Sequence, residues 1–169
     1  MIKPVIKYSI LCGVFLFALF FVSLGFGSNP LLDIRHFFFD LAIFFLFTFF
    51  AGKEFKDFRN NGYLHFWQGI SIGFLVFIPA VLIFSFALYV IFQLYPELIA
   101  GYKEGAKALL DSKREVFLKE FSEDQLEEQI TAVDAVTATQ LVFGTFWKKL
   151  IAGFFVTPVV SIILRKKPK

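Results

Sequence analysis

Four long apolar runs separated by polar segments dominate the pattern of the chain. The first and third runs contain no charged side chain, and the first would measure roughly 28 Å as an α-helix, close to the hydrocarbon thickness of a bilayer. Asp40 interrupts the second run, and Lys148 and Lys149 interrupt the fourth. The pattern predicts an all-α polytopic membrane protein with a single domain of four transmembrane helices. The predicted spans cover residues 8–26, 37–52, 66–95 and 146–164 of the chain, 1–169.

Composition supports a location in lipid. Hydrophobic residues make up 57% of the 169 residues and aromatic residues 20%, whereas charged residues make up only 18%. A soluble domain of this size could not bury so much apolar surface, so we expect the lipid bilayer to cover it. The 27 Phe residues then serve as lipid-facing and packing groups. We expect no nucleic-acid partner.

Basic residues gather in three segments that the predicted topology places on one side of the membrane. These segments hold nine Lys and Arg residues against two acidic ones, whereas residues 97–134 hold five basic and ten acidic residues. Lys and Arg in short loops favour the cytoplasmic side, so we expect an inner-membrane protein with both termini in the cytoplasm. Lys148 and Lys149 would then lie near the outer face, where we expect both to extend toward the interface beside Trp147. The nine basic residues are Lys3, Lys7, Lys53, Lys56, Arg59, Arg165, Lys166, Lys167 and Lys169.

The polar segment 97–140 predicts two amphipathic helices. A capping box opens the second helix at Ser122, so the turn would fall near Phe121. Arms of about 24 and about 19 residues suit an extracytoplasmic antiparallel helical hairpin that projects roughly 30 Å from the membrane. The side chains expected in its apolar seam are Phe117, Phe121, Leu126 and Ile130.

The outer faces of these two helices are acidic. Helices that lie flat on a membrane usually carry Lys and Arg, so the acidic faces favour a projecting hairpin over two interfacial helices. We expect a solvated surface for a membrane or periplasmic protein partner, formed by Glu120, Glu123, Asp124, Glu127 and Glu128.

Asp40 is the candidate for an intramembrane polar site. An ionisable residue inside an apolar run is a functional hypothesis by default. His36 lies one helical turn earlier, so we expect the two side chains to pair at the outer interface. The pair is either an interfacial anchor or, in a transport protein, the ionisable group.

Small residues recur at every fourth position in the third and fourth spans. Such spacing lets another helix approach closely, and that helix belongs either to the same chain or to a second copy in a homo-oligomer. The residues are Gly69, Gly73, Gly153, Thr157 and Ser161.

The stretch KDFRNNGYLHFWQG, residues 56–69, resembles the cytoplasmic loop and third-span entry of a bacterial inner-membrane family known only as a domain of unknown function. The family also has a Pro and a charged helical insert between its third and fourth spans, and basic residues after the fourth. Tyr95-Pro96-Glu97 and Arg165-Lys166-Lys167 occupy matching places. The resemblance covers nearly the whole chain and implies an architecture and a location, but no activity.

Motifs typical of enzymes do not stand out in the sequence. It lacks the metalloprotease and serine-hydrolase patterns, and the two histidines, His36 and His65, would lie on opposite faces of the membrane. We therefore expect no catalytic residue, cofactor or metal. The expected function is that of a non-enzymatic accessory or scaffold protein in a larger envelope complex. The alternative is a small oligomeric transporter or channel with Asp40 as its ionisable site.

Overall fold

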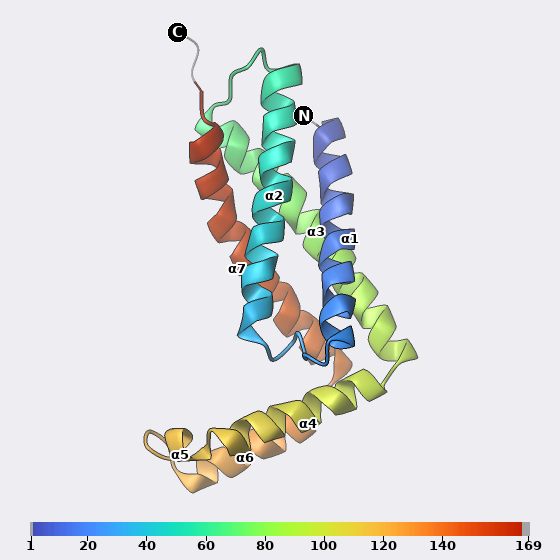
Figure 1. Ribbon diagram of the computed structural model, residues 1–169, viewed down its shortest axis with the longest axis vertical. Helices are drawn as coiled ribbons and strands as arrows, with labels where there is room; N and C mark the ends of the chain where they lie inside the picture. Colours follow the sequence, from blue (N-terminus) through green and yellow to red (C-terminus); the bar gives the residue numbers. More distant parts are fainter. Residues whose placement is uncertain (1, 167–169) are drawn as a thin grey trace.

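The computed structural model describes residues 2–166, and within this range the chain is all-α (Figure 1). Four helices, α1, α2, α3 and α7, are long and apolar enough to cross a membrane, which confirms the number predicted from sequence. Three shorter helices lie between α3 and α7. The bounds are α1 (Ile2–Gly25), α2 (Ile34–Arg59), α3 (Phe66–Leu94), α4 (Glu97–Ser112), α5 (Arg114–Phe117), α6 (Glu123–Asp134) and α7 (Ala138–Leu164).

The four long helices form one bundle. Helix α3 packs against the other three, and α2 also packs against α1 and α7. The start of α1, the loop between α2 and α3, and the end of α7 meet at one end of the bundle (Figure 1). A backbone bridge ties this end together, because Leu64 and Lys166 each donate an N–H to the other's carbonyl oxygen at 2.9 Å.

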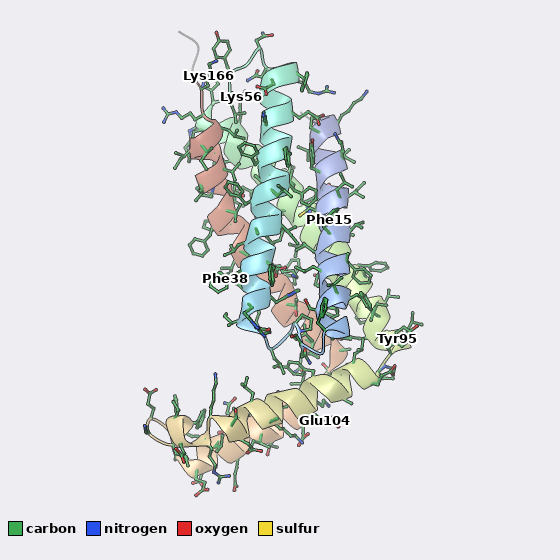
Figure 2. All side chains as sticks on the ribbon, in the orientation of Figure 1. Phe15, Phe38, Lys56, Tyr95, Glu104 and Lys166 are labelled. Atoms are coloured by element: carbon green, nitrogen blue, oxygen red, sulfur yellow. The ribbon has the colours of Figure 1, made fainter. Side chains whose placement is uncertain are left out.

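Large aromatic side chains cover the outside of the bundle. Phe15 on α1 and Phe38 on α2, both labelled in Figure 2, are exposed, whereas Phe44 and Phe84 are fully buried between the helices. Exposed Phe is unfavourable in water and favourable in hydrocarbon. The surface of the bundle therefore suits lipid.

Three spans extend beyond the apolar runs that predicted them, and the first of these, α1, begins at Ile2 instead of residue 8. Helix α2 includes the charged stretch 53–59, and its Lys56 and Arg59 lie in the last turn, where the helix dipole favours positive charge. Helix α7 begins at Ala138, because a capping box between Thr137 and Gln140 satisfies the first backbone donors there. Apolar runs mark the part of a helix that lies in lipid, whereas caps and charges set its ends.

The small residues of α3 and α7 face each other in this chain. A Cβ atom built on Gly69 would lie 2.9 Å from Ser161 Cβ, and one on Gly73 would lie 2.4 Å from Thr157 Cγ2. On the next turn the roles exchange, since a Cβ on Gly153 would lie 2.5 Å from the ring of Phe77 on α3. The contacts step by four residues in opposite directions, as expected for two antiparallel helices. The helix that approaches closely thus belongs to the same chain.

Helices α4 and α6 lie side by side across the far end of the bundle (Figure 1). Lys107 Nζ lies 2.5 Å from Asp134 Oδ1, and Arg114 pairs with Glu123, so the two helices run antiparallel. The expectation that this segment projects away along the bundle axis is wrong. The reason is that Leu98 on α4 packs against the core of the bundle, which holds α4 crosswise.

The seam between these helices is shorter than predicted. Helix α4 ends at Ser112, whose hydroxyl donates to Leu109 O and so competes with continued helix formation. The chain then makes the single turn α5 before Ser122 caps α6. Phe121 is 48% exposed and lies on Phe117, with ring centroids 4.7 Å apart. The apolar contact is concentrated instead on Leu126, the one buried side chain of α6.

Substitution of Gly73 by Ala tests the close packing of α3 on α7. Ala is favoured over Gly in a helix by about 1 kcal/mol, but the added methyl group would overlap Thr157, and overpacking costs about 1–3 kcal/mol. We expect Gly73→Ala to lower the free energy of unfolding, measured by circular dichroism during titration from mild detergent into dodecyl sulfate. Gly144→Ala on α7 is the matched control, because a Cβ there meets open space, and it should be neutral or stabilising. Equal stabilisation by both substitutions would contradict the packing.

Candidate functional site: a buried ion pair and its cavity

Asp40 on α2 and Lys149 on α7 form an ion pair inside the bundle. Lys149 Nζ donates to both carboxylate oxygens of Asp40, each at 2.6 Å. The two residues are only 4% and 2% exposed. Asp40 lies roughly 9 Å along the helix from the start of α2, at 1.5 Å per residue. The charges therefore lie within the bundle and not at its end.

An aromatic ring lies against the ammonium group of Lys149. Lys149 Nζ lies 4.3 Å from the ring centroid of Phe84 on α3, within the range of a cation–π interaction. Phe84 in turn packs edge to face on Phe20 of α1, with centroids 6.0 Å apart. All four spans thus contribute a side chain to one cluster. In such apolar surroundings either charge without the other would be costly, so each holds the other in place.

His36 lies next to the ion pair but is not bonded to it. Its Nε2 is 4.0 Å from Asp40 Oδ1, which is beyond hydrogen-bond distance. Its Nδ1 lies 3.4 Å from the hydroxyl of Ser23 on α1. The residue is only 7% exposed, and among the described residues Nε2 has no hydrogen-bond partner.

The start of α2 is fixed by a separate set of polar contacts. The Asp33 carboxylate accepts from the backbone N–H of Arg35 at 2.9 Å and caps the helix. The side chain of Arg35 also donates to it, and these bonds lower the pKa of Asp33 below its ordinary value. Just before it, Asn29 Oδ1 accepts from the backbone N–H of Leu31. The capped turn sets where His36 and Asp40 enter the bundle.

A cavity of about 270 Å³ opens beside the ion pair. Its walls come from the loop between α1 and α2 and from all four spans. About half of the lining residues are aromatic or aliphatic, and the polar ones include the exposed Lys148. The lining includes His36, Asp40, Lys149, Thr145, Phe20 and Phe84.

The sequence predicts one half of this site, Asp40, and not the other. The sequence predicts that Asp40 pairs with His36; the two side chains lie 4.0 Å apart, but the hydrogen bonds of Asp40 are with Lys149. Lys149 was expected to extend outward with Lys148, yet it is buried, while Lys148 is exposed. The sequence did contain a signal for the ion pair. The second span carries an acidic residue and the fourth span carries basic ones, and a bilayer favours the pairing of opposite charges.

The other sequence candidates lie apart from this site. His65 caps the start of α3, at the opposite end of the bundle from His36 (Figure 1). Within residues 2–166 no group of three His, Cys, Asp or Glu could hold a metal ion. The acidic residues proposed as a partner surface are all exposed, on α6 and just before it: Glu120, Glu123, Asp124, Glu127 and Glu128.

Replacement of Lys149 by Met should destabilise the bundle strongly. Met fills a similar volume but leaves the Asp40 carboxylate buried without its partner, and breaking a buried pair in this way costs about 3–5 kcal/mol. Lys148→Met is the matched control, since the neighbouring lysine is exposed, and it should change the free energy of unfolding by less than about 0.5 kcal/mol. Dodecyl sulfate titrations of the two variants measure the difference, and similar values for both would argue against the pair.

Comparison with known proteins places the chain in a family. No match was found among curated proteins, and none among solved structures. A family model described as a protein of unknown function, DUF4199, matches residues 7–166, from the first turns of α1 to the end of the described chain. The resemblance to an uncharacterised family is thereby confirmed. The chain belongs to DUF4199, a family of proteins of unknown function.

Proposed function

We propose that this protein is a non-enzymatic accessory or scaffold protein of the bacterial inner membrane. In this proposal both termini lie in the cytoplasm, and α4 and α6 form an extracytoplasmic hairpin that contacts a membrane or periplasmic partner protein. The observation that carries the proposal is that α4 and α6 each fully bury only one residue, Ala106 and Leu126, and that the charged side chains of α6 are all exposed.

The distribution of charge supports this orientation. Lys56 and Lys166 lie at the end of the bundle where α1 starts, and Glu104 lies on α4 at the opposite end (Figure 2). Lys and Arg near span ends favour the cytoplasmic side. Lys167 and Lys169, which belong to the same basic set, lie outside the described residues.

The exposed helices α4, α5 and α6 hold a defined arrangement, which supports their role as a contact surface. Ion pairs join α4 and α5 to α6, so the segment has a defined shape although little of it is buried. Its acidic side chains lie outside the core of the bundle. A rigid charged surface of this kind steers and selects a partner of opposite charge more than it adds stability to its own fold.

The interior of the bundle argues against ion conduction through a single copy of the chain. Buried hydroxyls on α7 bond to their own helix, with Thr157 donating to Gly153 O and Ser161 donating to Thr157 O. Between the ion pair and the basic end lie fully buried apolar residues such as Leu16, Phe44 and Val76. Among the described residues these leave no chain of polar groups through the bundle.

The alternative is a small oligomeric transporter or channel. The buried Asp40 and Lys149 beside a cavity favour it, because ionisable groups in a span often mark an ion or proton pathway. A second copy of the chain would then have to complete the pathway.

Cysteine labelling tests the orientation. In a Cys12→Ala background, Asn60→Cys and Glu115→Cys should differ in reaction with a membrane-impermeant thiol reagent on intact spheroplasts. Only the cysteine at 115 should react, since the proposal places α5 outside and the loop after α2 inside. Both variants should react after the membrane is permeabilised. Labelling at 60 in intact spheroplasts would overturn the topology.

Charge reversal tests the partner surface. Glu127→Lys with Glu128→Lys should weaken recovery of a partner in mild detergent from native membranes by severalfold, with stronger effects at low salt. The control is Glu104→Lys on α4 with Glu115→Lys on α5, which are also exposed and carry no ion pair within the described residues, and it should retain the partner. A proton or cation flux in liposomes that Asp40→Asn abolishes would contradict the scaffold and support the transporter.

A further inference from the structure

We propose that the cavity beside the ion pair binds a small uncharged aromatic compound that carries a hydroxyl group. This site is independent of the partner surface on α6 and of which side of the membrane it faces. The observations that carry it are the size of the cavity, the balance of charge in its walls and one unbonded nitrogen.

The cavity is too large for a packing defect. Protein interiors contain few voids larger than a water molecule. At roughly 30 Å³ per molecule, its volume of about 270 Å³ would hold about nine waters. It lies just below the usual range for small-molecule sites, about 300–1,000 Å³, which limits a ligand to a single ring with short substituents.

Charge at the inner wall excludes ions of either sign. An anion beside His36 would be repelled by the Asp40 carboxylate, and a cation would be repelled by Lys149. Both Asp40 oxygens already accept from Lys149 at 2.6 Å, so neither charge is free to bind an ion. Asp33, at the mouth, is likewise paired with Arg35. Lys148 also lines the cavity, but it is exposed. The charges buried at the inner wall are therefore all paired, and the part of the cavity beside His36 favours an uncharged ligand.

Among the described residues that line the cavity, only His36 has a buried polar atom without a hydrogen-bond partner. The Nδ1 atom of His36 faces Ser23, and Ser23 lines a neighbouring hollow. The Nε2 atom faces Asp40, and Asp40 lines this cavity. Thr145 on the opposite wall already donates its hydroxyl hydrogen to Leu141 O. A buried polar atom without a partner is costly, so a group that bonds to Nε2 gains free energy.

The chemistry of that group follows from the imidazole and the rings. A hydroxyl can donate to Nε2 or accept from it, so it suits either tautomer of the histidine. Phe20, Phe37 and Phe84 line the cavity and favour contact with another aromatic ring. A phenol combines the ring with the hydroxyl, has no charge at neutral pH and fits the volume.

The probe for this site is 4-fluorophenol, observed by fluorine NMR with the purified full-length protein in detergent micelles. We expect a saturable bound signal that unlabelled phenol displaces, in addition to the linear partition of the probe into micelles. His36→Leu removes the nitrogen and retains the bulk, and it should weaken binding about tenfold, the equivalent of one hydrogen bond. Ser85→Ala is the matched control, because the Ser85 hydroxyl is also buried and unbonded but does not line the cavity, and it should bind as the wild type does.

A second variant keeps the test decisive if His36→Leu fails to fold. Thr145→Leu narrows the cavity from the opposite wall without changing His36 or the ion pair, and it should also weaken binding at least tenfold. Circular dichroism establishes that each variant is folded. The absence of a saturable signal in the wild type would mean that the cavity holds only water and would overturn the proposal. Wild-type affinity in a folded His36→Leu or Thr145→Leu variant would overturn it as well.

Discussion

A charge inside a bilayer needs an opposite charge close by, and in this bundle the Asp40–Lys149 pair meets that constraint. The Lys149 ammonium bonds to both oxygens of the carboxylate at 2.6 Å, with an aromatic ring 4.3 Å from the nitrogen. Lipid offers neither group another partner. The pair therefore fixes how α2 and α7 are rotated about their axes, and it brings the neighbouring side chains of α1 and α3 into one cluster.

Two different interactions hold α7 in the bundle. Toward its C-terminal end, small residues let α7 approach α3 so closely that a methyl group on Gly73 would overlap Thr157. Closer to its start, the ion pair attaches α7 to α2. Packing of small residues sets the distance between helices, whereas the charges set rotation and register. Between the start of α2 and the ion pair a cavity remains, because the capped loop at Asp33 covers the end of the helices without filling the space beside His36.

The sequence predicted the four spans because hydrophobicity along one segment is a local property. It did not predict which of two adjacent lysines turns inward, because successive residues of an α-helix differ by about 100° and the rotation of the helix depends on its neighbours. Lys148 and Lys149 look alike in the sequence, yet one is exposed and the other is buried. Similarly, the capping box at Ser122 located the start of α6, but contacts of Leu98 with the bundle determine that α4 lies crosswise. The opposite charges in the second and fourth spans indicate that these spans pair, but the choice between the two lysines and the direction of α4 depend on contacts between segments far apart in the chain.

A double-mutant cycle measures the interaction between Asp40 and Lys149 most directly. The free energy of unfolding is compared for the wild type, Asp40→Asn, Lys149→Met and the protein with both substitutions. If the two charges stabilise each other in the folded bundle, the double substitution should cost less than the sum of the single ones, with a coupling energy of about 2 kcal/mol or more. Additive costs, within about 0.5 kcal/mol, would show that the residues do not interact and would contradict this account of the bundle.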